Sequence, residues 1–162
     1  MNNRKTAICG LLTALAILMG YVEMLIPLPV ALPGVKLGLA NVVIVIALYH
    51  LGTKTAFFLS LVRVVLSGLL FAGFAGLLYS LAGAMLSFLV MALLKKTGKM
   101  SIVGISIAGG IFHNVGQIIV AALVVENVKM AYYLPFLLLS GVVTGFFIGL
   151  VAKFCLPHLP RQ

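Results

Sequence analysis

The chain has almost no carboxylates. Its 162 residues include no aspartate, and Glu23 and Glu126 are its only acidic side chains, against 11 lysines and arginines. Magnesium sites that hold a diphosphate are built from carboxylates, so this chain cannot assemble such a site alone. The phosphate-loop pattern G-x-x-x-x-G-K-[ST] is also missing, and we therefore expect no ATP chemistry in this chain.

Cysteine is scarce as well. Cys9 and Cys155 are the only two, and their spacing matches no metal motif. We interpret both as packing residues and predict neither a metal site nor a cofactor. Long linkers, low-complexity tracts and fixed-period repeats are also missing, so we expect residues 1–162 to form a single domain.

Hydrophobic residues dominate what remains. They make up 64% of the chain, only 8% of residues are charged, and apolar runs near the bilayer-spanning length of about 20 recur throughout. The net charge of +9 comes from cations in short segments between these runs. This placement argues against nucleic acid as a partner and indicates an all-α integral membrane protein.

Hydropathy and the positions of glycine, proline and lysine predict six transmembrane helices. Their expected ranges are Thr6 to Ile26, Lys36 to Leu51, Lys54 to Phe71, Phe74 to Leu94, Ser101 to Val125 and Met130 to Phe154.

The cations are distributed unevenly between the two sides of such a bundle. One side receives Arg4, Lys5, Lys54, Lys95, Lys96, Lys99, Lys153 and Arg161, and the other receives only Lys36 and Lys129. The positive-inside rule then places both termini in the cytoplasm. No small-residue cleavage site follows the first apolar run, so we expect this helix to be retained.

Arg63 is the one cation left inside a predicted span, near its middle. A charge at that depth costs at least about 2.5–3.5 kcal/mol, so it usually faces the bundle interior, a partner or a ligand. A structural ion pair with Glu23, or bonds to backbone carbonyls, would explain Arg63 equally well. The sequence does not choose between these roles.

Polar residues inside the predicted spans lie mostly in the outer half, with Arg63 and His113 near the middle and Lys36 at the outer rim, so we expect an outward-opening binding pocket. The predicted substrate-binding residues are Glu23, Lys36, Asn41, Arg63, Tyr79, His113, Asn114 and Gln117. His113 and Gln117 lie four residues apart on one helix face, beside Gly109, Gly110 and Gly116, which permit close backbone approach. Arg63 and Lys36 favour an anionic ligand. The alternative is that the amides and His113 are interhelical hydrogen-bonding residues.

Two further segments have candidate roles. Residues 27–35 contain three prolines and are apolar, which predicts a nonhelical outer loop that covers the pocket as a lid, or an ordinary apolar turn. Thr6, Gly10 and Ala14 recur every four residues on the first helix. Such small residues pack against another helix, either within this bundle or in a partner membrane protein.

Two longer motifs resemble a known family. The segments PGVKLGLAN, residues 33–41, and HNVGQ, residues 113–117, are similar to the "Gx transporter" group, also labelled heptaprenyl diphosphate synthase component I. The small-residue segment GLLTALA, residues 10–16, and the six spans resemble the S components of energy-coupling-factor (ECF) transporters.

The resemblance implies a substrate-binding subunit in the bacterial cell membrane, in contact with membrane lipid. It would capture a small molecule and join a transmembrane coupling subunit and two cytoplasmic ATPases, with Thr6, Gly10 and Ala14 docking the coupling subunit. The chain itself would not be an enzyme. The chemistry of the pocket leaves a vitamin, a flavin-like molecule, or an isoprenoid or quinone precursor with an anionic head as ligands.

Two alternatives remain from the sequence. The synthase label suggests a membrane accessory subunit of a separate prenyltransferase, because this chain has no aspartate-rich motif. A stand-alone ion-coupled transporter would use Glu23, Arg63 and His113 as a relay, but the inner half offers no comparable titratable chain. Catalysis by His113 is poorly supported, since no acidic orienter or nucleophile stands at a defined spacing.

Overall fold

The computed structural model describes residues 3–25 and 38–159, and every regular element in these two ranges is helical. The predicted lid, residues 27–35, and Lys36 lie outside the described residues. The helices are α1 (Asn3–Leu25), α2 (Leu39–His50), α3 (Thr53–Ser67), α4 (Gly73–Thr97), α5 (Ile102–Val124) and α6 (Leu134–Cys155). Three short segments adjoin them: the π-helix η1 (Gly68–Ala72) and the 3-10 helices η2 (Val128–Tyr133) and η3 (Leu156–His158).

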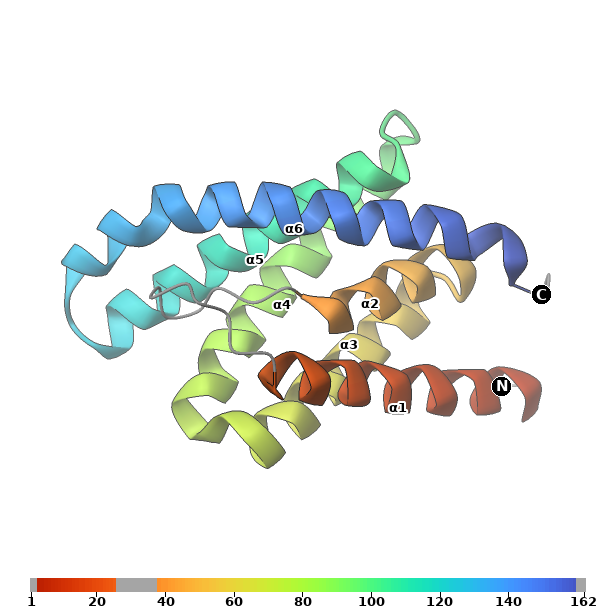
Figure 1. The fold of residues 1–162 in the computed structure, drawn as a ribbon, viewed down its shortest axis with the longest axis horizontal. Coiled ribbons are helices and arrows are strands. Elements are labelled where there is room, and N and C mark those ends of the chain that lie inside the picture. The colour runs from red at the N-terminus through yellow and green to blue at the C-terminus, as the bar shows by residue number, and fades with distance from the viewer. Residues whose placement is uncertain (1–2, 26–37, 160–162) are drawn as a thin grey trace.

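Within the described residues, four continuous helical stretches are long and apolar enough to cross a membrane, which indicates a multi-pass membrane protein. They are Thr6–Leu25, Thr53–Thr97, Ile102–Val124 and Lys129–His158. The 45-residue stretch contains both α3 and α4, which reverse direction at η1 (Figure 1). The 12 residues of α2 span only about 18 Å, less than the roughly 30 Å of a bilayer core. The count of six spans and the cytoplasmic termini therefore stay predictions.

Both ends of the described chain lie at one end of the bundle, together with the turn between α2 and α3 (Figure 1). We call this the basic end, because it carries the lysines at the start of α3 and in the last turns of α4 and α6. These are Lys54, Lys95, Lys96 and Lys153. The turn between α5 and α6 and the reversal at η1 lie at the opposite end.

Helices α4, α5 and α6 pack with their backbones in close contact at glycines. A Cβ atom added to Gly116 would lie 2.7 Å from the Ala82 carbonyl oxygen, and one on Gly145 would lie 2.7 Å from Ile107 Cα. Gly110 abuts the backbone of Gly141 in the same way. The predicted close approach along α5 is confirmed, and it fixes α5 as the central wall of the bundle.

The short helix α2 is the most buried element, with an unbroken buried run from Val43 to Leu48. Its last turn is held by Lys95 of α4, whose Nζ donates a hydrogen bond of 2.5 Å to the Leu48 carbonyl oxygen. The same ammonium lies 5.0 Å from the centre of the Tyr49 ring. A cation here satisfies a carbonyl that the end of the helix leaves without an intrahelical partner.

Candidate functional site

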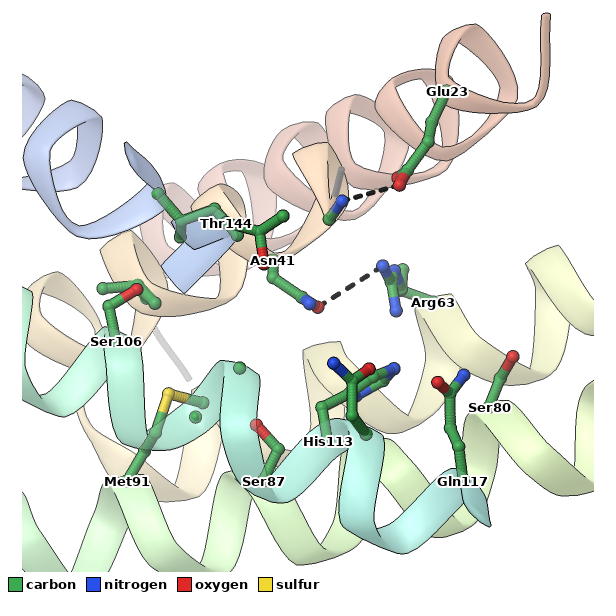
Figure 2. Close-up of a pocket in the computed structure, with 16 residues that line it drawn as sticks. Glu23, Asn41, Arg63, Ser80, Ser87, Met91, Ser106, His113, Gln117 and Thr144 are labelled. Carbon is green, nitrogen blue, oxygen red and sulfur yellow. Dashed lines mark hydrogen bonds between the residues drawn. The ribbon is translucent and has the colours of Figure 1, made fainter. Parts of the chain in front are cut away.

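A cavity of about 70 Å³ lies among the helices, and most of the residues that line it have polar side chains (Figure 2). This volume holds several water molecules or a small head group. Each of the six α-helices contributes residues to its wall, and so does Gly38, which precedes α2. The lining residues are Glu23, Gly38, Asn41, Val45, Arg63, Ser80, Ser87, Met91, Ser106, Gly109, Gly110, His113, Asn114, Gln117, Thr144 and Ile148.

Arg63 extends from α3 into this cavity, and its donors are poorly satisfied. Its Nη2 donates to Asn41 Oδ1 over 3.5 Å, which is long for a hydrogen bond (Figure 2). Its Nε is buried and has no hydrogen-bond partner among the described residues. A guanidinium offers five donors in a planar fork, so Arg63 retains capacity for an acceptor within the cavity.

The carboxylate of Glu23 is engaged by backbone rather than by Arg63. Its Oε1 accepts a 2.6 Å hydrogen bond from the Gly38 N–H, which precedes α2 (Figure 2). Gly38 has φ of 73°, a left-handed conformation that favours glycine at this start. Across the described ranges, no salt bridge joins Glu23 to the Arg63 guanidinium, although Glu23 acts on Arg63 through its charge.

His113 and Gln117 come from one face of α5, as predicted, and both line the cavity opposite Arg63 (Figure 2). Gly83 of α4 lies directly behind them. A Cβ added there would lie 2.7 Å from the His113 carbonyl oxygen and 2.8 Å from Gln117 Cγ. Gly83 therefore sets how deeply these two side chains sit, a role that the sequence analysis missed.

Asn114 combines the two roles that the sequence left open. It borders the cavity, and its Nδ2 donates a 2.5 Å hydrogen bond to the Leu137 carbonyl oxygen of α6. The bond crosses between two helices in a buried environment, so Asn114 fixes α6 against α5. One of the two N–H donors of its amide is thereby used for structure.

Tyr79, which we expected to add an aromatic wall, is not among the residues that line the cavity. Its neighbour Ser80 lines the cavity instead, because successive helical side chains diverge by about 100°. Sequence reasoning also missed a set of hydroxyl residues on the same wall, namely Ser80, Ser87, Ser106 and Thr144. The seven-residue spacing of Ser80 and Ser87, two helical turns, was the available signal.

Ser87, Ser106 and Thr144 extend the polar lining towards the basic end, whereas Ser80 lies beside Gln117 (Figure 2). Ser106 and Gln117 are eleven residues apart on α5, which corresponds to about 16 Å along the helix. The Ser106 Oγ is buried and has no hydrogen-bond partner in the described structure, whereas Thr144 Oγ1 donates to the Ser140 carbonyl oxygen at 2.9 Å. The cavity thus has a cationic part at Arg63 and a neutral hydroxyl part nearer the basic end.

The small residues of α1 separate into two groups. Thr6, Gly10 and Ala14 are exposed, and a Cβ added to Gly10 would meet no atom within 4 Å. Ala16 is fully buried, and Gly20 faces Ser67 of α3. The predicted docking residues therefore take no part in packing within the described bundle and leave a shallow outer face on α1.

Comparison with known proteins identifies a family. A family model described as "Heptaprenyl diphosphate synthase component I" matches residues 12–155, which covers all six α-helices in whole or in part. No curated protein and no solved structure shows significant similarity to the chain.

Proposed function

The chain belongs to the heptaprenyl diphosphate synthase component I family, and from this premise we propose that it is the substrate-binding subunit of an ECF-type importer. It captures a small anionic solute, such as a vitamin or an isoprenoid or quinone precursor, from outside the cell. The cavity among the spans holds the anionic head of the solute, and Arg63 binds this head.

One observation carries this proposal, namely the buried Arg63 Nε without a partner beside a polar cavity. Burying a guanidinium is costly unless its charge and its donors are matched. Within the described structure Glu23 binds the Gly38 N–H, and Asn41 gives Arg63 only a long contact. An anionic ligand with two oxygens would supply the missing acceptors in the bidentate geometry that arginine favours.

Import also requires partners, because the sequence has no phosphate loop. In the proposed complex, a transmembrane coupling subunit docks on the exposed face of Thr6, Gly10 and Ala14, and two cytoplasmic ATPases supply the energy. The absence of internal contacts at Gly10 supports this use of the face. Small residues let another helix approach closely.

The family name favours a second candidate, a membrane accessory subunit of a prenyltransferase, since "component I" implies another component. Any catalysis would then belong to that component. The two carboxylates of this chain are Glu23 on α1, bound to Gly38 N–H, and Glu126, which is exposed in the turn that follows α5. They do not form the acidic cluster that a diphosphate-bound magnesium needs.

The test is purification of the protein in mild detergent, with mass spectrometry of the small molecules that remain bound. Arg63→Ala should lose an anionic compound that the wild type retains, and Arg63→Lys should lose most of it, because an ammonium lacks the paired planar donors. Ser67→Ala is the matched control: Ser67 is also buried without a partner, one turn from Arg63, but does not line the cavity.

Retention of the same compound by wild type and Arg63→Ala would refute the pocket. Co-purification with a soluble prenyltransferase whose turnover rises would favour the accessory subunit instead. Gly10→Leu should abolish association with a coupling subunit and leave the bound compound in place, because the new side chain meets open space within this bundle. Ala75→Leu, also exposed but on α4, controls for added bulk.

A further inference from the structure

A second hollow lies between α3 and α4 on the outer surface, and among the described residues none lines both this hollow and the solute cavity. Its volume is about 620 Å³, and its walls are almost wholly apolar. Phe57 and Phe88 form its floor with their rings 5.5 Å apart, while Phe58, Met85 and Leu89 form its rims. Phe58 is 63% exposed and Leu89 is 55% exposed, so the groove opens away from the bundle.

The length of the groove matches one leaflet of a bilayer. Along α4 it runs from Ala82 to Ala92, ten residues or about 15 Å. The hydrocarbon core of a bilayer is about 30 Å thick, so a leaflet contributes about half of that. One extended acyl chain therefore fits the groove better than a helix that crosses the whole membrane.

The charge at one end of the groove indicates which lipid it accepts. Lys54 is the only charged residue among the described residues of the lining, and it lies at the basic end, where α3 begins. Gly52 caps α3 without a side-chain hydrogen bond, so N–H groups of the first turn point towards the same place. Neither carboxylate of the chain lines the groove.

We propose that this groove binds a phospholipid with an anionic head group. One acyl chain lies between α3 and α4, along Phe57 and Leu86, and the phosphate and its anionic substituent lie at Lys54. The site is separate from the solute cavity. It gives the chain a lipid requirement that does not depend on the solute or on the importer role.

The test compares phosphatidylglycerol and phosphatidylcholine with identical acyl chains, each titrated into the full-length detergent-solubilised protein and counted by native mass spectrometry. Wild type should bind phosphatidylglycerol more tightly. Lys54→Gln should weaken the binding of phosphatidylglycerol about fivefold and leave the binding of phosphatidylcholine unchanged. The reason is that one lysine near the surface contributes about 1 kcal/mol to the binding of an anionic lipid. Lys96→Gln, an exposed lysine at the same end but outside the groove, should have little effect.

A second variant tests the apolar part. Ala82→Leu fills the groove and should weaken the binding of both lipids equally. The same change at Ala75, outside the groove, should weaken the binding of neither. Equal effects of Lys54→Gln and Lys96→Gln would overturn the head-group site. Unchanged binding in Ala82→Leu would overturn the acyl-chain site. Competition by glycerol phosphate as strong as by the whole lipid would show that the site binds phosphate rather than a lipid.

Discussion

Gly83 gives a sharp test of how the solute cavity is built, because its side chain is only a hydrogen atom. In Gly83→Ala the new Cβ would lie 2.7 Å from the His113 carbonyl oxygen, 2.8 Å from Gln117 Cγ and 3.1 Å from His113 Cε1. Favourable heavy-atom contacts lie near about 3.5–4.0 Å. Helices α4 and α5 must therefore separate by on the order of half an ångström, or the two site side chains must move.

The expected cost follows from this overlap. One extra methyl group in a tightly packed interior lowers the free energy of unfolding by about 1–3 kcal/mol. For a chain of this size, each kcal/mol lowers the melting temperature by about 2–4 °C. Gly83→Ala should therefore melt about 2–12 °C below wild type. Because His113 and Gln117 are displaced towards Arg63, the variant should also retain less of the anionic compound that the wild type holds.

Thermal unfolding followed by circular dichroism in detergent measures the first effect, and mass spectrometry of the bound compound measures the second. Gly10→Ala is the control, since its Cβ meets open space in the described structure; it should leave ligand retention unchanged and should not lower the melting temperature, because alanine favours a helix more than glycine does. Gln117→Ala removes the Cγ contact but leaves the backbone of His113 in place. In the double variant with Gly83→Ala, most of the stability loss should therefore persist. A Gly83→Ala protein with wild-type melting and ligand retention would refute the proposed α4–α5 contact.

The remaining predictions concern three polar residues, and the same melting assay checks each of them. Asn114→Ala should destabilise the protein by about 0.6–2 kcal/mol because it removes the hydrogen bond to the Leu137 carbonyl oxygen, and an unchanged melting temperature would contradict that role. Lys95→Met should destabilise by about 1 kcal/mol and raise hydrogen exchange in the last turn of α2, where Lys95 binds the Leu48 carbonyl oxygen; unchanged exchange there would count against the contact. Ser106→Ala should melt no lower than wild type, since the Oγ that it removes has no partner in the described structure. A large loss would show that this hydroxyl is structurally bonded.

Helix positions could be predicted from the sequence because apolar runs are bounded by glycine and lysine. The start of α5 was predicted at Ser101, and the structure begins the helix at Ile102, with the Ser101 hydroxyl accepting the Gly104 N–H as its cap. The end of α3 was predicted less well. Its α-helical part stops at Ser67 and continues as a π-helix, which hydropathy does not distinguish from an α-helix.

The cavity was predicted in part, for a physical reason. A charge or an amide inside a span needs a partner, so Arg63, Asn41 and Gln117 were recognisable. Serine often satisfies itself by bonding the carbonyl four residues back, so a hydroxyl inside a span signals little. The hydrogen bond from the Gly38 N–H to Glu23 could not be predicted from the sequence either, because many other backbone N–H groups could have donated to this carboxylate.

The proposed solute site depends on the shortage of hydrogen-bond acceptors and negative charge around Arg63. This shortage is the same whichever of the two candidate functions is correct. Among the described residues, the buried carboxylate of Glu23 is bound by a backbone N–H, and Asn41 contributes one long contact to Arg63. If the Glu23 carboxylate were the main compensation for the guanidinium, Glu23→Gln would leave Arg63 without a counter-charge, and the anionic compound would be bound more tightly or the fold would be lost. If Glu23 instead serves the start of α2, Glu23→Gln should keep both the fold and the bound compound, because its amide oxygen still accepts the Gly38 N–H. We expect the second result, and release of the compound from a folded Glu23→Gln protein would contradict it.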